Sequence, residues 1–148
     1  MMVRYHHRQL GILVLWIGCA ALIGFIALLV FVEAPPIGIA VLLCLLVCFI
    51  LFGALTVEVT DTEVHLRFGP GLIRKSFSIS DIRRVEVVRN AWYFGWGIRR
   101  IPRGWLYNVS GLNAIELEMS DGHLNRIGTD QPEELLAAIE KVRRKLGN

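Results

Sequence analysis

The chain has 148 residues, of which 54% are apolar and 20% are charged, and its formal net charge is +3. Soluble domains average about 45–50% apolar and about 25% charged residues. The apolar excess lies in residues 1–55, whose only charged side chains are Arg4, Arg8 and Glu33. This distribution excludes a simple cytosolic globule, and the apolar stretch is too short for a large multi-pass transporter.

Two uncharged apolar runs, residues 10–32 and 37–55, follow a short N-terminal tail. A bilayer core about 30 Å thick needs about 20 apolar residues in helical conformation, so both runs predict membrane-spanning helices. Residues 33–36 alone separate them, and two prolines in this segment end the first helix. An antiparallel hairpin is therefore expected. A cleaved signal peptide is the alternative for the first run, although its apolar core would be only about 7–15 residues long.

The charges that flank the two runs predict their orientation. Basic residues precede the first run and follow the second, namely Arg4, Arg8, Arg67, Arg74 and Lys75, whereas the loop between the runs carries only Glu33. Because basic flanks are retained on the cytoplasmic side, we expect a multi-pass protein of the inner (cytoplasmic) membrane. Both termini should be cytoplasmic, with residues 33–36 outside.

Small and sulfur-containing residues within the runs bear on helix packing. The first run contains a series of small residues, Gly18, Ala20, Ala21 and Gly24. These small residues favour close packing of the first run against the second run over dimerisation.

All cysteines of the chain lie in the two runs, namely Cys19, Cys44 and Cys48. No His, Asp or Glu lies at that depth to complete a metal site, so we expect the cysteines to be small apolar filler.

From residue 56 onward, apolar and polar residues alternate with a period of two, which is typical of half-buried strands. Such runs predict six or seven short antiparallel strands at 56–60, 63–68, 72–79, 82–89, 105–109, 114–120 and 123–128. Turn residues separate several of them at Asp61-Thr62, Gly69-Pro70-Gly71 and Asp121-Gly122. The stretch before residue 105 is expected to be irregular.

The last segment is predicted to be a helix that covers the strands. Its apolar residues recur at intervals of three and four, at Leu135, Ile139, Val142 and Leu146, which indicates a core-facing stripe. The expected fold is a membrane α-hairpin plus an all-β roll capped by a C-terminal helix. The tail and hairpin would occupy residues 1–55 and the cytoplasmic domain residues 56–148, which are enough for a core of its own.

Three stretches of the second half resemble a known family: residues 80–89 (SDIRRVEVVR), 95–114 (GWGIRRIPRGWLYNVSGLNA) and 126–132 (RIGTDQP). The chain resembles the bacterial pleckstrin-homology-like (PH-like) membrane proteins, in which two helices precede a small β-roll domain. The resemblance implies a PH-like fold and carries no catalytic residues with it. PH-like domains elsewhere bind phosphoinositides through basic residues in the first β-hairpin loop. The corresponding loop here, residues 60–63, is acidic, which argues against inositide binding.

Residues 87–115 are the most informative segment for function. They contain no Asp or Glu, and they combine four arginines with six aromatic residues. Aromatic and basic residues together are typical of the membrane–water interface. The candidate membrane or ligand contacts are Arg89, Trp92, Trp96, Arg99, Arg100, Arg103, Trp105 and Tyr107. In the alternative interpretation, the aromatic residues pack beneath the sheet and the arginines donate hydrogen bonds to loop carbonyls.

Other constellations in the sequence are weaker. Asp61, Glu63 and His65 alternate and could share a strand face as metal ligands, but the solvent face of a hairpin is the favoured interpretation. No nucleophile pattern is present, and Gly95-Trp96-Gly97 lacks the context of a nucleotide site. No cofactor or metal is therefore expected. Residues 56–148 carry 14 basic and 12 acidic residues, too small an excess to predict nucleic-acid binding.

The sequence therefore predicts a non-enzymatic membrane protein whose PH-like domain serves as a binding or assembly module at the membrane surface. Its expected partners are the lipid bilayer and either another protein or a second copy of the chain. The alternative is an anionic-lipid or small-ligand sensor that uses residues 87–115. A cavity lined jointly by Trp96, Arg99, Arg100 and Trp105 would favour the sensor.

Overall fold

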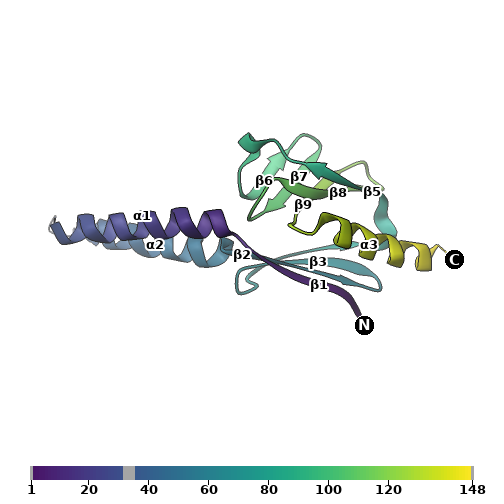
Figure 1. Ribbon diagram of the computed structural model, residues 1–148, viewed down its shortest axis with the longest axis horizontal. Helices are drawn as coiled ribbons and strands as arrows, with labels where there is room; N and C mark the ends of the chain where they lie inside the picture. Colours follow the sequence, from purple (N-terminus) through teal and green to yellow (C-terminus); the bar gives the residue numbers. More distant parts are fainter. Residues whose placement is uncertain (1, 32–35, 148) are drawn as a thin grey trace.

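The computed structural model describes residues 2–31 and 36–147 (Figure 1). Its elements in chain order are β1 (Val3–Leu10), α1 (Ile12–Phe31), α2 (Pro36–Phe52), β2 (Ala54–Thr60), β3 (Glu63–Phe68), β4 (Ile73–Ser78), the short 3-10 helix η1 (Ile79–Asp81), β5 (Ile82–Arg89), a second 3-10 helix η2 (Trp92–Phe94), β6 (Gly97–Ile101), β7 (Gly104–Asn108), β8 (Asn113–Met119), β9 (Leu124–Gly128) and α3 (Pro132–Leu146).

The strands form two sheets with a shared core. The first sheet has the antiparallel order β1-β2-β3-β4, and the second has the order β5-β8-β9-β7-β6. Figure 1 shows α3 running between the two sheets. The alternate apolar residues of the strands and one stripe of α3 meet there, and Leu66, Phe68, Ile115, Leu135 and Ile139 are almost completely buried. The predicted C-terminal helix packed on a β-rich domain is confirmed.

The N-terminal residues form a strand, which the sequence did not predict. Residues 1–9 were expected to be a tail, but Val3–Leu10 pairs with β2, with one register shift between Val3 and Tyr5. The side chains that β1 turns inward are Tyr5, His7 and Gln9, so the strand has no alternation of aliphatic and polar residues that would reveal it. The helical hairpin is therefore an insertion between two paired strands.

No linker separates the helices from the first sheet. The last strand pair is Leu10 with Ala54, and the Gly11 amide then donates to the Gly53 carbonyl at 2.9 Å. The helix α1 starts at the next residue. Both helices accordingly leave the sheet side by side, and the start of β1 and the end of α3 lie at the opposite end of the molecule from the outer ends of the helices (Figure 1).

The two helices are shorter than the predicted spans 10–32 and 37–55, because residues at their sheet-side ends belong to strands. None of the 18-residue apolar window Val14–Phe31 is buried in the protein. At about 1.5 Å per residue, α1 has the length of a membrane span, and a signal sequence would share this property. The helix α2 has 17 residues, at the lower end of the about 17–25 that span a bilayer.

Contacts between the helices involve one of the predicted small residues. A Cβ atom at Gly18 would overlap the ring of Phe49 in α2, whereas a Cβ atom at Gly24 would meet nothing within 4 Å. Gly18 thus allows the helices of one chain to approach each other. The cysteines are free and exposed on the helix surfaces.

Three details of the β domain differ from the sequence prediction. The stretch expected to be irregular contains β6, and the strands are not all antiparallel, because β7 pairs in parallel with β9. Parallel pairing depends on contacts distant in sequence, which local patterns do not reveal. Leu146, predicted in the buried stripe, is the last residue of α3 and is 51% exposed.

Side chains of β1 join the two sheets. The Gln9 amide donates from Nε2 to the Ser110 carbonyl at 3.0 Å, and His7 Nε2 lies 2.6 Å from Oδ1 of Asp130. The Tyr5 hydroxyl donates to Oε1 of Gln131 at 3.3 Å, just before α3. These contacts fix the second sheet and α3 relative to the strand that leads into the hairpin.

Candidate membrane-facing surface

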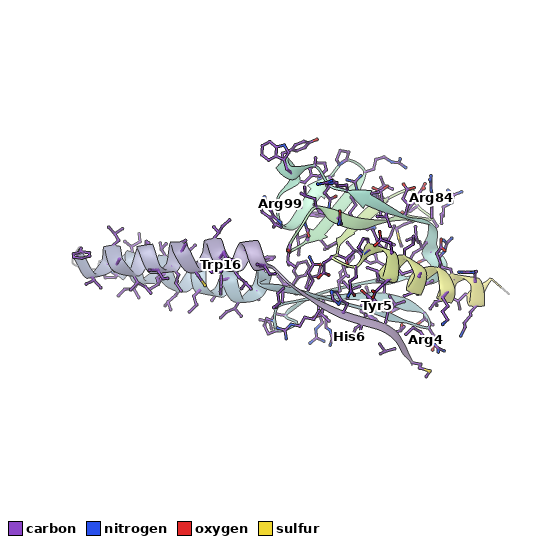
Figure 2. All side chains as sticks on the ribbon, in the orientation of Figure 1. Arg4, Tyr5, His6, Trp16, Arg84 and Arg99 are labelled. Atoms are coloured by element: carbon purple, nitrogen blue, oxygen red, sulfur yellow. The ribbon has the colours of Figure 1, made fainter. Side chains whose placement is uncertain are left out.

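The basic aromatic segment, residues 87–115, forms most of one end of the second sheet. It contains the end of β5, the short η2 helix, β6, β7 and the connection to β8. In Figure 2, Arg99 on β6 lies at the end of the domain nearer the helices, whereas Arg84 on β5 lies at the far end. The segment is therefore presented towards the side from which the helices extend.

An aromatic cluster is exposed at the tip of this segment. Trp92 is 78% exposed and Tyr93 is 69% exposed, both within η2. Their rings lie edge to face with centroids 6.1 Å apart, and the next pair, Tyr93 and Phe94, lies at 4.9 Å. Large aromatic side chains with polar tips are common at membrane interfaces. The exposure of this tip is the feature of the segment that most favours contact with lipid.

The arginines of the segment point in different directions. Arg99 and Arg100 are consecutive on β6, so their side chains leave opposite faces of the strand. The Arg99 Nε group donates to the Trp96 carbonyl at 3.1 Å, and Arg103 donates to the Gly122 carbonyl at 3.1 Å. Arg89 ends β5 with its side chain exposed. Two arginines thus bond to loop carbonyls, as the packing interpretation expects.

Trp105 and Tyr107 extend from the same face of β7 but differ in burial. Trp105 is 45% exposed and lies opposite Arg100 on β6. Both side chains, together with Arg103, line a cavity of about 280 Å³. Tyr107 is only 6% exposed and packs against Phe77, and burial raises the pKa of its hydroxyl. Tyr107 is thus packed mainly in the core, unlike the exposed aromatic residues of the segment.

The four residues proposed to share one ligand cavity do not do so. Arg99 and Arg100 occupy opposite faces of β6, so they cannot line one cavity together. The indole nitrogen of Trp96 is buried without a hydrogen-bond partner among the described residues. Of the four residues, Arg100 and Trp105 border one cavity together.

The alternating residues Asp61, Glu63 and His65 lie on the solvent face of the first sheet. Asp61 accepts a hydrogen bond from Arg4 Nε at 2.6 Å, which holds the pKa of its carboxyl below the usual range. Oε2 of Glu63 lies 3.3 Å from Nε2 of His65. No group of three metal-ligating side chains is found within residues 2–31 and 36–147.

A second basic surface lies on the first sheet and was not predicted as a site. Arg8, Arg67 and Arg74 come from β1, β3 and β4 and border a cavity of about 670 Å³ beside the helix ends. From the sequence alone, these arginines were used only to predict the orientation of the two helices in the membrane. Their grouping depends on strand β1, which the sequence pattern did not reveal.

Comparisons of the chain with protein-family models, with curated proteins and with solved structures found no match.

Proposed function

We propose that the chain is an integral membrane protein whose helical hairpin crosses the inner membrane and holds the β domain against the cytoplasmic surface. The observation that carries this proposal is the direct continuation of the paired strands β1 and β2 into α1 and α2. A domain attached in this way cannot move away from the bilayer when the helices are inserted.

Exposure of the helices supports insertion of both. Large apolar side chains project from α1 and α2 with no protein around them, and examples are Trp16, Ile23, Val30, Ile37 and Leu43. Apolar surface of this extent is typical of membrane or protein contacts. Because the helices are antiparallel neighbours of similar length, a bilayer that covers α1 also covers α2.

The orientation follows from charge. The strands and turns at the sheet-side ends of both helices carry Arg8, Arg67 and Arg74, and basic residues near membrane spans are retained in the cytoplasm. The β domain and both termini therefore face the cytoplasm in this proposal.

The β domain acts, in this proposal, as a non-enzymatic binding or assembly module. Its two sheets and C-terminal helix are compatible with the PH-like resemblance. The divergent directions of Arg99 and Arg100 suit an extended contact surface better than a reaction site.

Reporter fusions test the proposal. A reporter active only in the cytoplasm should work when fused to the C terminus and fail when inserted between Ala34 and Pro35. A C-terminal reporter active only outside the cytoplasm, or release of the full chain from membranes by alkaline carbonate, contradicts the proposal.

A second candidate function, favoured by the exposure of Trp92 and Tyr93, is sensing of anionic lipid or a small ligand by residues 87–115. Near an anionic leaflet each basic residue contributes roughly 1 kcal/mol. Replacing Arg99, Arg100 and Arg103 by Gln should then weaken contact with anionic vesicles in a salt-dependent way. A lower melting temperature with unchanged vesicle contact indicates that these arginines only hold their loops.

A further inference from the structure

Three arginines lie in one line across the outer face of the first sheet, with Thr56 between the first two. Arg8 on β1 lies opposite Thr56 on β2, and Thr56 lies opposite Arg67 on β3. Arg67 in turn lies opposite Arg74 on β4. Directly opposite residues of antiparallel strands share a face, with Cβ atoms about 4.5–5.5 Å apart. We refer to Arg8, Arg67 and Arg74 as the arginine row.

The arginine row is costly for the isolated protein. Like charges directly opposite each other destabilise a sheet, and Arg67 and Arg74 are such a pair. Glu58 forms an ion pair with Arg67, and its Oε1 also lies 3.4 Å from Nε2 of His6. One carboxylate is therefore shared by two basic groups. Arg74 donates from Nε to the Gly71 carbonyl at 2.5 Å, which fixes its direction without neutralising its charge.

The row borders a cavity with two chemically different walls. The cavity has a volume of about 670 Å³, and none of its lining residues is acidic. The arginine row supplies the polar wall, and Leu15, Phe49 and Ile50 of the two helices supply the apolar wall. Its volume lies within the about 300–1,000 Å³ of small-ligand sites. A ligand with a charged head and an apolar tail matches both walls.

The depth of the cavity fits a lipid headgroup. Arg8 precedes the last strand residue, Leu10, by two positions, or about 7 Å along the strand, and α1 begins at Ile12. Figure 2 shows His6, the next outward-facing residue of β1, beyond the helix ends and on the domain side. When the helices are inserted, the arginine row lies at the level of the phosphates and the apolar wall lies at the level of the acyl chains.

We propose that the arginine row binds the phosphate of an anionic phospholipid of the adjoining leaflet, with an acyl chain along Leu15, Phe49 and Ile50. Guanidinium groups bind phosphate through paired, charge-assisted hydrogen bonds. The bound phosphate offsets the repulsion within the row. This inference depends on the proposed insertion of the hairpin, and it assigns the domain a lipid site separate from residues 87–115.

Spin-labelled lipids measure this binding on the full chain in nanodiscs. The protein is placed in phosphatidylcholine discs with trace spin-labelled phosphatidylglycerol or spin-labelled phosphatidylcholine, and the immobilised fraction of each label is recorded. We expect the wild type to prefer phosphatidylglycerol. The double variant Arg67→Gln, Arg74→Gln should lose this preference by about fivefold for each arginine, because each contributes roughly 1 kcal/mol.

A matched control and a stabilising variant separate binding from folding. The double variant Arg84→Gln, Arg144→Gln removes two exposed charges away from the row and should keep the wild-type preference. Thr56→Glu places a carboxylate between Arg8 and Arg67. It should raise the melting temperature in phosphatidylcholine, because repulsion falls, and should still lower the preference for phosphatidylglycerol. A merely structural row would not give these opposite effects.

Three results would overturn the inference. Equal lipid preference in the row variants and in the control shows that the row is not the site. Loss of the wild-type preference on addition of inorganic phosphate at constant ionic strength shows that free phosphate is the ligand. Removal of the protein from liposomes by alkaline carbonate shows that the hairpin is not inserted, and this result contradicts the proposed function as well.

Discussion

Ile139 lies in the middle of α3 and is completely buried between the two sheets. Ile139→Asp would place a carboxylate in this core, and burial of an unpaired charge costs several kcal/mol, of the order of the whole stability of about 5–15 kcal/mol. We expect the variant to melt far below the wild type or to remain unfolded, as measured by circular dichroism in detergent. Leu146→Asp, at an exposed position of the same helix, should melt close to the wild type. Equal melting of Ile139→Asp and wild type would contradict the position of α3.

Tyr5 makes the stability of the domain sensitive to alkaline pH. Burial, together with the charges of Glu134 and Asp130, raises the pKa of its hydroxyl to about 12, whereas an unfolded tyrosine titrates near about 10. Between these values the unfolded chain loses the proton and the folded chain keeps it, so folding stability falls as pH rises. Below about pH 10 the Tyr5 hydroxyl is protonated in both the folded and the unfolded chain, so it contributes no pH dependence to folding stability there.

The Tyr5→Phe variant should therefore lose less stability than the wild type between about pH 10 and about pH 12. It lacks the hydrogen bond from Tyr5 to Gln131, so its stability at neutral pH should be somewhat lower. The measurement is urea denaturation of both proteins in the same detergent at several pH values. Parallel pH profiles would show that Tyr5 is not buried as described.

At the scale of elements, the β domain contains strand β1 from the other side of the helical hairpin. Residues 56–148 alone lack this edge strand and leave one side of β2 unpaired, which favours aggregation. Replacing residues 12–52 by the dipeptide Asn-Gly should join β1 to β2 through a tight turn of the kind that hairpins prefer. The ends already approach each other, since Gly11 bonds to Gly53.

We expect this hairpin-deleted protein to be soluble and monomeric, with one helix and a β-rich circular dichroism spectrum. The fragment 56–148 should instead aggregate or unfold, because it also loses the contacts of Tyr5, His7 and Gln9 with the second sheet and α3. Size-exclusion chromatography of the two proteins gives the comparison. A stable monomer of 56–148 would show that β1 is dispensable.

The elements that the sequence predicted are those with strong local patterns. The strand Ile82–Arg89 and the helix with buried Leu135, Ile139 and Val142 match the prediction closely. Strand β1 was missed because its inward residues are aromatic or polar, and its partner lies more than 40 positions away, beyond two helices. Pairing between distant segments depends on the whole fold rather than on local composition.

The same limit applies to the candidate surfaces. The composition of residues 87–115 revealed the aromatic tip at Trp92, but it could not show that Tyr107 is a core residue. The arginine row was invisible for a different reason, because Arg8 joins Arg67 and Arg74 only through the register of β1 with β2. Charge near the helix ends was evident from the sequence, whereas its arrangement in a row required the structure.

At the scale of the whole molecule, the proposed bilayer surrounds α1 and α2 and ends at the level of Leu10 and Ala54, where the strands β1 and β2 meet the helices. Ile23 and Leu45 lie within the two helices, and Ser80 lies on the exposed surface of η1. A spin label at each position reports depth, because oxygen concentrates in the bilayer core and a water-soluble nickel chelate does not.

The most direct test is this depth measurement on the full chain in liposomes, with the three native cysteines replaced by Ala. Labels at Ile23→Cys and Leu45→Cys should relax with oxygen and be shielded from the nickel chelate, whereas the label at Ser80→Cys should show the reverse. The nickel chelate would contradict the insertion of the hairpin if it relaxed the label at Ile23→Cys or at Leu45→Cys as strongly as the label at Ser80→Cys.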